Sequence, residues 1–351
     1  MKKLFLLLFA LAGAVSVSAQ LSDGVSATLI DGDTTKVFYG YDSFRNAYAA
    51  AKQTGCTIVL SPGSFSTQEY INKSIKVYGA GFQPDKTSGV SETRIMGHMR
   101  IQDKDGYTPE DVHIEGVYVV GNIYLMGSNT INDTEIVKCR MDNFLQQAPS
   151  HNTIIRQSYI TNGIGGEGRV GDSFVVSNCY LQVFNNFAAG SQLMVANSVL
   201  THGDCIHSAA LYKNCIFSSN YYGGGFRSGS IGAGSTCYNN VGWQGCIECN
   251  QNNVYADNYY EGVWGGKWNA FFADGQDNLN YTDTDGNPRT WELAEPEKYV
   301  GTDGTPCGLT GGDFPWNPIP TLPRIVSTSV DAKSVPGKLK VNIKAEARPL
   351  E

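Results

Sequence analysis

The chain has 351 residues, of which only 17% are charged, and it contains 40 glycines and 19 tyrosines. This composition is typical of a turn-rich all-β protein and argues against a predominantly helical one. The formal net charge of −7 at pH 7 argues against nucleic acid as a partner, because surfaces that bind nucleic acid are usually basic.

The first 19 residues have the pattern of a secretion signal. Lys2 and Lys3 form a positive end, residues 4–15 are apolar, and residues 17–19 form a small-residue cleavage site. No later apolar run approaches the ~20 residues that a membrane span needs. We therefore expect an exported protein without a membrane span, located in the periplasm, on the cell surface or outside the cell.

Residues 20–40 are expected to be a leader that precedes the main domain at residues 41–267. At the start of that domain, residues 43–53 predict an amphipathic helix, because four apolar side chains share one stripe: Phe44, Ala47, Tyr48 and Ala51. Residues 57–60 and 74–81 then read as two apolar strands that end in turns.

One six-residue phrase recurs from residue 111 to residue 261. It predicts a strand, a tight bend and a second strand, and its copies follow one another at about twenty residues, which suits one turn of a solenoid. The copies begin at Ile114, Ile136, Ile155, Val176, Val195 and Tyr212, with weaker copies at Cys237 and Tyr255.

The third and fourth positions of the phrase predict two ladders. The third position favours residues that tolerate a left-handed backbone, and stacked coils would align them at one bend: Asn178, Asn197, Asn214, Asn239 and Asp257. The fourth position carries small residues that suit an inward stack: Cys139, Ser158, Cys179, Ser198 and Cys215. We expect these cysteines to be buried and free, because alternate coils are ~10 Å apart and out of disulfide reach.

These features resemble the pectin-lyase-like family, over residues 41–267. The asparagine bends, the early helix and the segments TIVLSPGSF and SIKVYGAG carry the resemblance. It implies an all-β fold, a right-handed parallel β-helix with an N-terminal capping helix, in a protein directed at a polysaccharide. A leucine-rich repeat is the alternative, but the fixed leucine spacing of that repeat is missing.

The remaining chain breaks the period. Residues 268–323 are rich in Gly, Asp, Pro and Trp, and we expect an irregular strap laid on the helix side. Residues 324–351 contain two short alternating runs that predict a terminal strand pair. Residues 283–287 superficially resemble a calcium loop, although a plain turn accounts for them better because further ligands are missing.

A candidate site follows from the second strand that each coil needs. If Leu145, Phe187, Ile206, Phe226 and Ile247 point inward, the next residues point outward, so His207, Arg227 and Glu248 form one column on successive coils ~4.8 Å apart. Four aromatic residues in the adjoining turns are candidate stacking surfaces for sugar rings: Tyr221, Tyr222, Trp243 and Trp264.

The family resemblance suggests how that column would act. In a lyase, Arg227 would be the base or the carboxylate clamp, His207 would carry a proton, and Glu248 would orient the arginine. The alternative is that these three residues form a row of exposed charges that has no function. The chain lacks the aspartate motifs of polygalacturonases and the arginine motif of the main pectate lyases.

Three hypotheses therefore stay open. The protein is a polysaccharide lyase or glycoside hydrolase that acts on an acidic glycan, or a non-catalytic carbohydrate-binding or adhesive surface protein, or a purely structural solenoid. Calcium is the candidate cofactor, because the lyases of the family often use it. No metal site is predicted from Cys246 and Cys249, a lone CxxC pair, and we expect a monomer.

Overall fold

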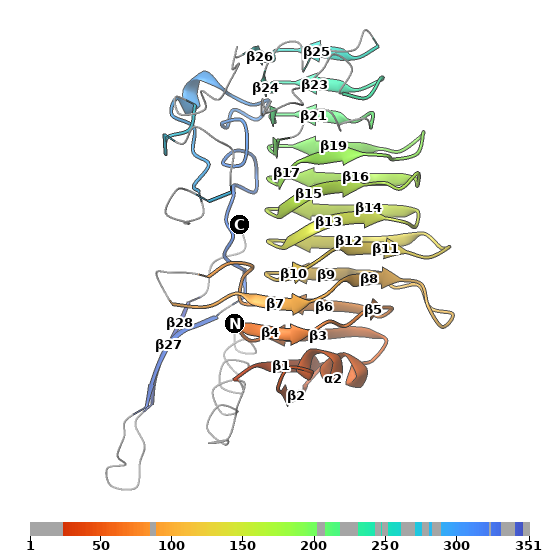
Figure 1. The fold of residues 1–351 in the computed structure, drawn as a ribbon, viewed down its shortest axis with the longest axis vertical. Coiled ribbons are helices and arrows are strands. Elements are labelled where there is room, and N and C mark those ends of the chain that lie inside the picture. The colour runs from red at the N-terminus through yellow and green to blue at the C-terminus, as the bar shows by residue number, and fades with distance from the viewer. Residues whose placement is uncertain are drawn as a thin grey trace, which may run out of the picture.

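The computed structural model describes residues 24–84, 89–201, 208–217, 231–242, 247, 252–260, 271–275, 281–282, 289–322, 324–330 and 341–346. Within these ranges the chain is a parallel β-solenoid built from two long sheets (Figure 1). The predicted secretion signal lies outside the described residues. No helix in the described part of the chain is long and apolar enough to cross a membrane.

Sheet A has 12 strands over the described residues, in the spatial order β2 (Thr34–Tyr39), β1 (Ser26–Asp31), β3 (Thr54–Leu60), β6 (Ser74–Tyr78), β9 (Val112–Glu115), β12 (Ile131–Val137), β14 (Ser150–Arg156), β16 (Gly171–Ser177), β19 (Leu193–Ala196), β21 (Leu211–Lys213), β23 (Thr236–Tyr238) and β25 (Val254–Ala256). From β3 onward every neighbouring pair is parallel, as successive turns of one solenoid require.

Sheet B has 14 strands over the same residues, and each of its rows contains the second strand or strand pair of one coil. In chain order they are β4 (Gly63–Ser66), β5 (Tyr70–Ile71), β7 (Thr93–Met96), β8 (Met99–Gln102), β10 (Tyr118–Val120), β11 (Ile123–Met126), β13 (Arg140–Gln146), β15 (Tyr159–Gly165), β17 (Tyr180–Leu181), β18 (Val183–Asn185), β20 (Val199–Leu200), β22 (Ile216–Phe217), β24 (Val241–Gly242) and β26 (Tyr259–Tyr260).

The N-terminal end of the solenoid is covered by a hairpin and a helix. Strands β1 and β2 pair with each other, and β1 pairs antiparallel with β3, so residues expected to be a leader extend sheet A. Helix α2 (Ser43–Ala50) packs against this hairpin and buries Phe44, Ala47 and Tyr48, and it ends three residues before the predicted boundary. Together they protect strand edges that would otherwise invite pairing with another chain.

The interior is a stack of aliphatic side chains in register. Ile58, Val77, Ile114, Ile136 and Ile155 occupy one position on successive strands of sheet A, and all five are fully buried. Burying one such side chain contributes roughly 1.5–3 kcal/mol, so the repeated phrase supplies the core one coil at a time.

The two predicted ladders are confirmed at the bend between the sheets. Asn178, Asn197 and Asn214 have φ angles of +50°, +47° and +56°, and each follows strand residues that pair in register with the next coil. Inside the bend, the amide of Cys139 donates to Ser158 Oγ and the amide of Cys179 donates to Ser198 Oγ, both at 3.1 Å.

The cysteine prediction is confirmed for the same coils. The three thiols of the inward stack are buried and free, and burial raises the pKa of each of them to about 12: Cys139, Cys179 and Cys215. Such thiols stay protonated near neutral pH, so they act as packing groups rather than nucleophiles.

Residues 299–322, called the strap from here on, run back along the line of bends towards the N-terminal coils (Figure 1). Asn239 Nδ2 donates to Val300 O, Asn178 Nδ2 donates to Leu309 O and Gly311 O, and Lys138 Nζ donates to Ile319 O. The asparagine ladder is therefore the surface to which the strap binds, as well as a set of bends.

A second hydrophobic cluster lies outside the solenoid, on the outer face of sheet B. There Val199, Ile216 and Val241 pack under residues that come just before the strap, among them Phe272 and Trp291. Arg289 fixes this covering segment with two hydrogen bonds to Asp274, at 2.6 and 2.9 Å, and its side chain is fully buried. The short helix η3 (Pro296–Lys298) leads from this segment into the strap.

The chain beyond the strap forms a separate two-stranded sheet. Strand β27 (Arg324–Val330) pairs antiparallel with β28 (Val341–Glu346), and neither pairs with sheet A or sheet B.

Candidate functional site

The site predicted from the sequence lies outside the described residues. This holds for the column His207, Arg227 and Glu248 and for the four aromatic residues Tyr221, Tyr222, Trp243 and Trp264. It also holds for Cys246, Cys249 and residues 283–287, so the structure does not test the expectations about metal and calcium binding there. In the described part of the chain, no group of three or more His, Cys, Asp or Glu residues could hold a metal ion.

The inward direction assumed for that column is wrong for Leu145, whereas Ile247 is fully buried in the core as assumed. Phe144, Ile164 and Phe184 share the inward position of sheet B, whereas Leu145 faces outward and is only half-buried. The reason is a register shift between β13 and β15 after Met141, where β15 has one residue more, and the buried positions of β13 resume at Phe144.

The same shift places Gln146 inward, a residue that the assumed register placed on the surface. Its buried amide donates to Val170 O and accepts a hydrogen bond from Ser150 Oγ. Phe187 does pack against the core, but it lies beyond β18 after a left-handed bend at Asn186, so it does not share the position of Leu145.

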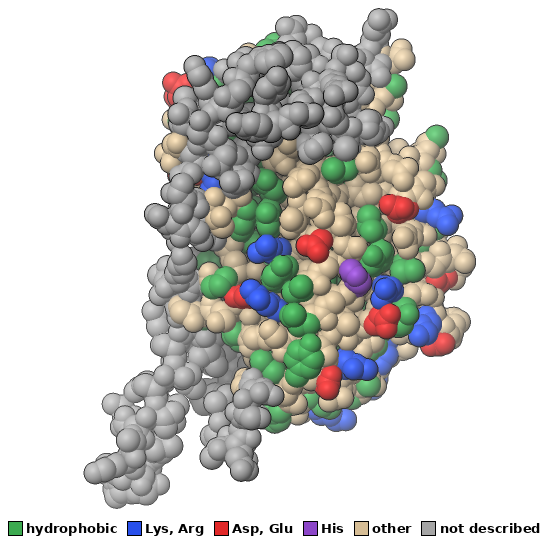
Figure 2. Space-filling view, in the orientation of Figure 1, with side chains coloured by type: hydrophobic (Ala, Val, Ile, Leu, Met, Phe, Trp, Pro, Cys, Tyr) green, Lys and Arg blue, Asp and Glu red, His purple; other side chains and the backbone are tan. Residues whose placement is uncertain are grey.

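The described residues place a different set of side chains on the outer face of sheet B. Arg94, Tyr118, Arg140 and Tyr159 occupy one outward position on four successive strands, and they are called the Arg/Tyr column from here on. Each is followed by a buried aliphatic or methionine residue, so the strand alternation directs it to the surface. Figure 2 shows this face, where blue basic side chains lie next to green ones over the lower coils.

The side chains of the column stack on one another. The guanidinium carbon of Arg140 lies 4.4 Å from the ring centroid of Tyr118 and 5.2 Å from that of Tyr159. Arg94 lies 5.5 Å from the Tyr118 ring on the other side. Tyr159 in turn stacks on Tyr281 with centroids 4.0 Å apart. Each cation–π contact contributes ~0.5–1 kcal/mol at an exposed site and, more importantly here, fixes the orientation of the groups.

The two arginines differ in their partners. Arg94 forms an ion pair with Glu92 at 2.6 Å. Arg140 forms no ion pair with any carboxylate in the described ranges, and its Nε atom is buried without a hydrogen-bond partner. A guanidinium held between two rings and not neutralised by a carboxylate of the described ranges is suited to receive a planar anion such as a carboxylate.

A second group of similar residues lies on the far part of the same face. Tyr70, Arg100 and Tyr124 share one outward position, with the Arg100 guanidinium 5.7 and 5.5 Å from the two rings. Here Arg100 is already paired with Glu69 at 2.8 Å. His98 lies between the two columns, with its ring 5.7 Å from that of Tyr124.

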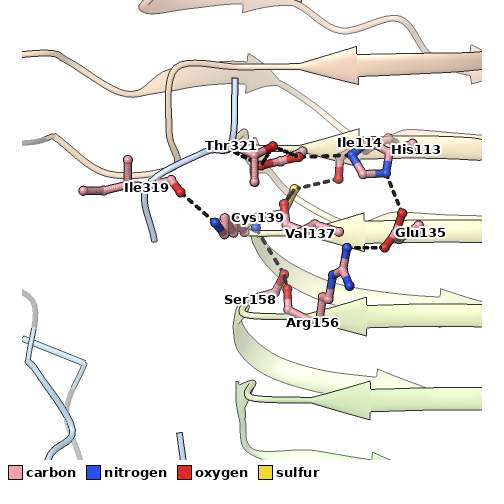
Figure 3. A network of polar contacts seen from close by, with 11 residues as sticks. His113, Ile114, Glu135, Val137, Cys139, Arg156, Ser158, Ile319 and Thr321 are labelled. Atoms are coloured by element: carbon pink, nitrogen blue, oxygen red, sulfur yellow. Dashed lines mark hydrogen bonds and ion pairs between the residues drawn. The ribbon is translucent and has the colours of Figure 1, made fainter. Parts of the chain in front are cut away.

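A buried polar network lies on the outer face of sheet A, on the side of the strap (Figure 3). His113 Nδ1 is 2.7 Å from Glu135 Oε2, and its Nε2 is 3.2 Å from Glu115 Oε2. Arg156 Nη2 donates to Glu135 Oε1 at 2.6 Å. The strap closes the network, because both the amide and the hydroxyl of Thr321 donate to Glu115.

The charges of this network support one another. Burial lowers the pKa of His113, but hydrogen bonds and ion pairs with Glu115 and Glu135 outweigh it, so the pKa lies above its ordinary value. Burial raises the pKa of Glu115, but hydrogen bonds from His113 and Thr321 outweigh it and hold the pKa below its ordinary value. With Glu115 only 2% exposed and both of its oxygens occupied, the network acts as an anchor for the strap rather than as a ligand site.

The Arg/Tyr column was missed from the sequence although the repeat contains its signal. Tyr118, Arg140 and Tyr159 are the fifth residues of three successive copies of the repeated phrase. An alignment of the copies by position would have placed them in one outward line.

Comparison of the chain with protein-family models, with curated proteins and with solved structures gives no significant match. The structure alone therefore shows the parallel β-solenoid.

Proposed function

We propose that the protein binds an acidic carbohydrate chain along the Arg/Tyr column. The observation that carries this proposal is Arg140, a guanidinium without a carboxylate partner in the described ranges, held between two tyrosine rings. The tyrosines of the column hold the guanidinium in place, and an arginine binds a carboxylate or sulfate through two parallel hydrogen bonds.

The shape of the face supports a chain-like ligand. The column follows the solenoid axis over four coils, so its groups recur every ~4.8 Å and can contact successive units of an extended polymer. The net charge of −7 disfavours nucleic acid, whose high charge density needs a broadly basic surface.

Three expectations from the sequence belong to the same proposal. They are export by the N-terminal signal, membership of the pectin-lyase-like family, and cleavage of the bound glycan by the column His207, Arg227 and Glu248. The parallel β-solenoid with asparagine bends supports the second. An Arg227→Ala change tests the third, because it should abolish the formation of unsaturated uronate or of new reducing ends.

Binding is tested with the full chain and a panel of acidic and neutral glycans in calorimetry. We expect Arg140→Gln to weaken binding of acidic glycans at least tenfold, a loss of ~1.4 kcal/mol. The matched control is Arg45→Gln, which removes an exposed arginine from helix α2 and should leave the affinity unchanged. Failure of the unaltered protein to bind any acidic glycan, or an Arg140→Gln variant that binds like the parent, would overturn the proposal.

A further inference from the structure

A row of three polar side chains crosses sheet B between the Arg/Tyr column and Arg100. His98, Asn122 and Asn143 occupy one position on three successive coils, because the strand residues that follow each of them pair in parallel register. They are called the polar row from here on, and all three are at least partly exposed. Asn143 lies three residues after Arg140 on β13, and a rise of ~3.3 Å per residue places the two ~10 Å apart. One oligosaccharide can therefore contact both Arg140 and the polar row.

The ring of His98 is held in one orientation. The backbone amide of Asn122 donates to His98 Nδ1 at 2.9 Å, and the ring of Tyr124 packs edge-on against it with centroids 5.7 Å apart. Gly121 makes room for the ring, because a Cβ atom there would lie 2.7 Å from His98 Nδ1. Since a backbone amide can only donate, Nδ1 accepts and the proton of the neutral imidazole is on Nε2. The surface therefore presents an N–H donor at His98 Nε2.

The two asparagines continue the row as a chain of hydrogen bonds. Asn143 Nδ2 donates to Asn122 Oδ1 at 3.0 Å, and Asn122 Nδ2 donates to the Tyr124 hydroxyl oxygen at 2.7 Å. The chain has one direction, so it leaves an acceptor at Asn143 Oδ1 and a donor in the hydroxyl proton of Tyr124. Together with His98 Nε2, these are two donors and one acceptor that no residue within the described ranges uses.

We infer that the polar row and the Tyr124 hydroxyl form a subsite for the hydroxyl groups of a sugar, beside the anion site at Arg140. This inference rests on the proposed function and adds which groups of the ligand are recognised. A sugar hydroxyl both donates and accepts, so one sugar can use the donors and the acceptor of the subsite together, whereas an ionised carboxylate, sulfate or phosphate only accepts. The ligand is then a sugar anion with unsubstituted hydroxyls, and not a peptide or phosphate polyanion.

Asp142 directs the charge of the ligand away from the polar row. It lies between Arg140 and Asn143 on β13 and is partly exposed. Its carboxylate accepts hydrogen bonds from hydroxyl groups but repels a second carboxylate or a phosphate in the same place. The anionic group of the ligand is therefore bound at Arg140, and its hydroxyl groups are bound at the polar row.

The test of the ligand compares four hexamers on the full chain in calorimetry at constant salt. They are a uronic acid hexasaccharide, the same hexasaccharide with O-acetylated hydroxyls, hexaglutamate and a neutral glucan hexasaccharide. The free uronic acid hexasaccharide should bind at least tenfold more tightly than hexaglutamate and at least fivefold more tightly than its acetylated form. Equal binding of either of these two overturns the inference and leaves anion binding at Arg140 intact. A neutral hexasaccharide that binds as tightly as the acidic one overturns the proposed function instead, and failure of all four to bind overturns both.

Two variants of the subsite remove single hydrogen-bonding groups and keep an aromatic ring. Tyr124→Phe and His98→Phe should each weaken binding of the uronic acid hexasaccharide at least fivefold and leave that of hexaglutamate unchanged, whereas Arg140→Gln should weaken both. The matched control is Tyr70→Phe, because Tyr70 also shares the outward position of Arg100 but lies outside the polar row, and its affinity should equal that of the parent. If Tyr124→Phe has a native far-UV spectrum and binds the hexasaccharide like Tyr70→Phe, the inference is wrong, whether or not His98→Phe folds.

Discussion

One outward-facing residue position of sheet B has different surroundings in the lower and the upper coils of the solenoid. In the lower coils it carries Arg94, Tyr118 and Arg140, which are exposed or partly exposed. In the upper coils it carries Val199, Ile216 and Val241, which are buried under the segment that precedes the strap. The backbone is the same in both regions, so the coil geometry does not decide which residues this position accepts. The covering segment accounts for the difference, and it leaves the lower coils available for the proposed binding.

The largest effect should come from breaking the cover of the upper coils. Trp291 is 1% exposed, and Trp291→Ala should lower the free energy of unfolding by ~3–5 kcal/mol, because it leaves a cavity in the outer cluster. Denaturant unfolding measures this loss. Tyr118→Ala is the control from the lower coils and should lower the free energy of unfolding by less than ~1 kcal/mol. Similar losses for the two variants would contradict the distinction between the two regions.

A smaller loss should follow from detaching the strap. Asn178→Gly keeps the left-handed bend but removes two hydrogen bonds to strap carbonyls, so it should cost ~1–2 kcal/mol. Asn178→Ala removes the same bonds and adds left-handed strain, for a further ~1 kcal/mol. If thermal or denaturant unfolding shows that Asn178→Ala is more stable than Asn178→Gly, then left-handed backbone strain does not contribute at this bend.

The lower anchor of the strap should make stability depend on pH. Since the folded pKa of His113 lies above 6.5, its contribution is complete below pH 6.5 and is lost as the pH rises through the folded value. The lowered pKa values of Glu115 and Glu135 act in the opposite direction, because their contribution is present above pH 4.5 and is lost as the pH falls through the folded values. We expect a maximum of stability between these limits.

The variant His113→Gln provides the control for this pH dependence. Unfolding measured from pH 5 to pH 9 should show a decline on the alkaline side in the parent and a flatter curve in His113→Gln. A parent whose stability rises from pH 6.5 to pH 9 would contradict the assignment of a protonated His113 between the two carboxylates.

The smallest effect should come from Arg140→Lys, which keeps the charge of the lower coils and removes the planar guanidinium. We expect binding of an acidic glycan to weaken about fourfold, or ~0.8 kcal/mol, because an ammonium cannot donate two parallel hydrogen bonds or stack between rings. Stability should change by less than ~0.5 kcal/mol. Unchanged affinity in calorimetry would show that charge alone matters at this position.

Local patterns predicted the features that repeat with the coil. The left-handed bends at Asn178 and Asn197 and the buried thiol of Cys139 follow from residue types at fixed places in the phrase. The position of Leu145 could not be predicted in the same way, because the register shift between β13 and β15 has no fixed sequence signal.

Contacts between distant parts of the chain could not be predicted from the sequence. Asn178 and Gly311 are 133 residues apart in the sequence, and Glu115 and Thr321 are 206 apart. No periodicity links such residues, so the anchoring of the strap could be seen only in the folded chain. The proposed binding role of Arg140 depends in the same way on which neighbouring positions the covering segment leaves open.

The strap has a consequence for how the solenoid loses its structure. In a solenoid without such a segment, each coil contacts only its neighbours, so unfolding can begin by fraying at one end and proceed coil by coil. Here one segment is tied to coils from Asn239 down to Glu115, so the coils between these two residues cannot separate one by one without detaching it. Because the strap is synthesised after the coils it joins, the nascent solenoid becomes a single cooperative unit only once residues 299–322 have left the ribosome.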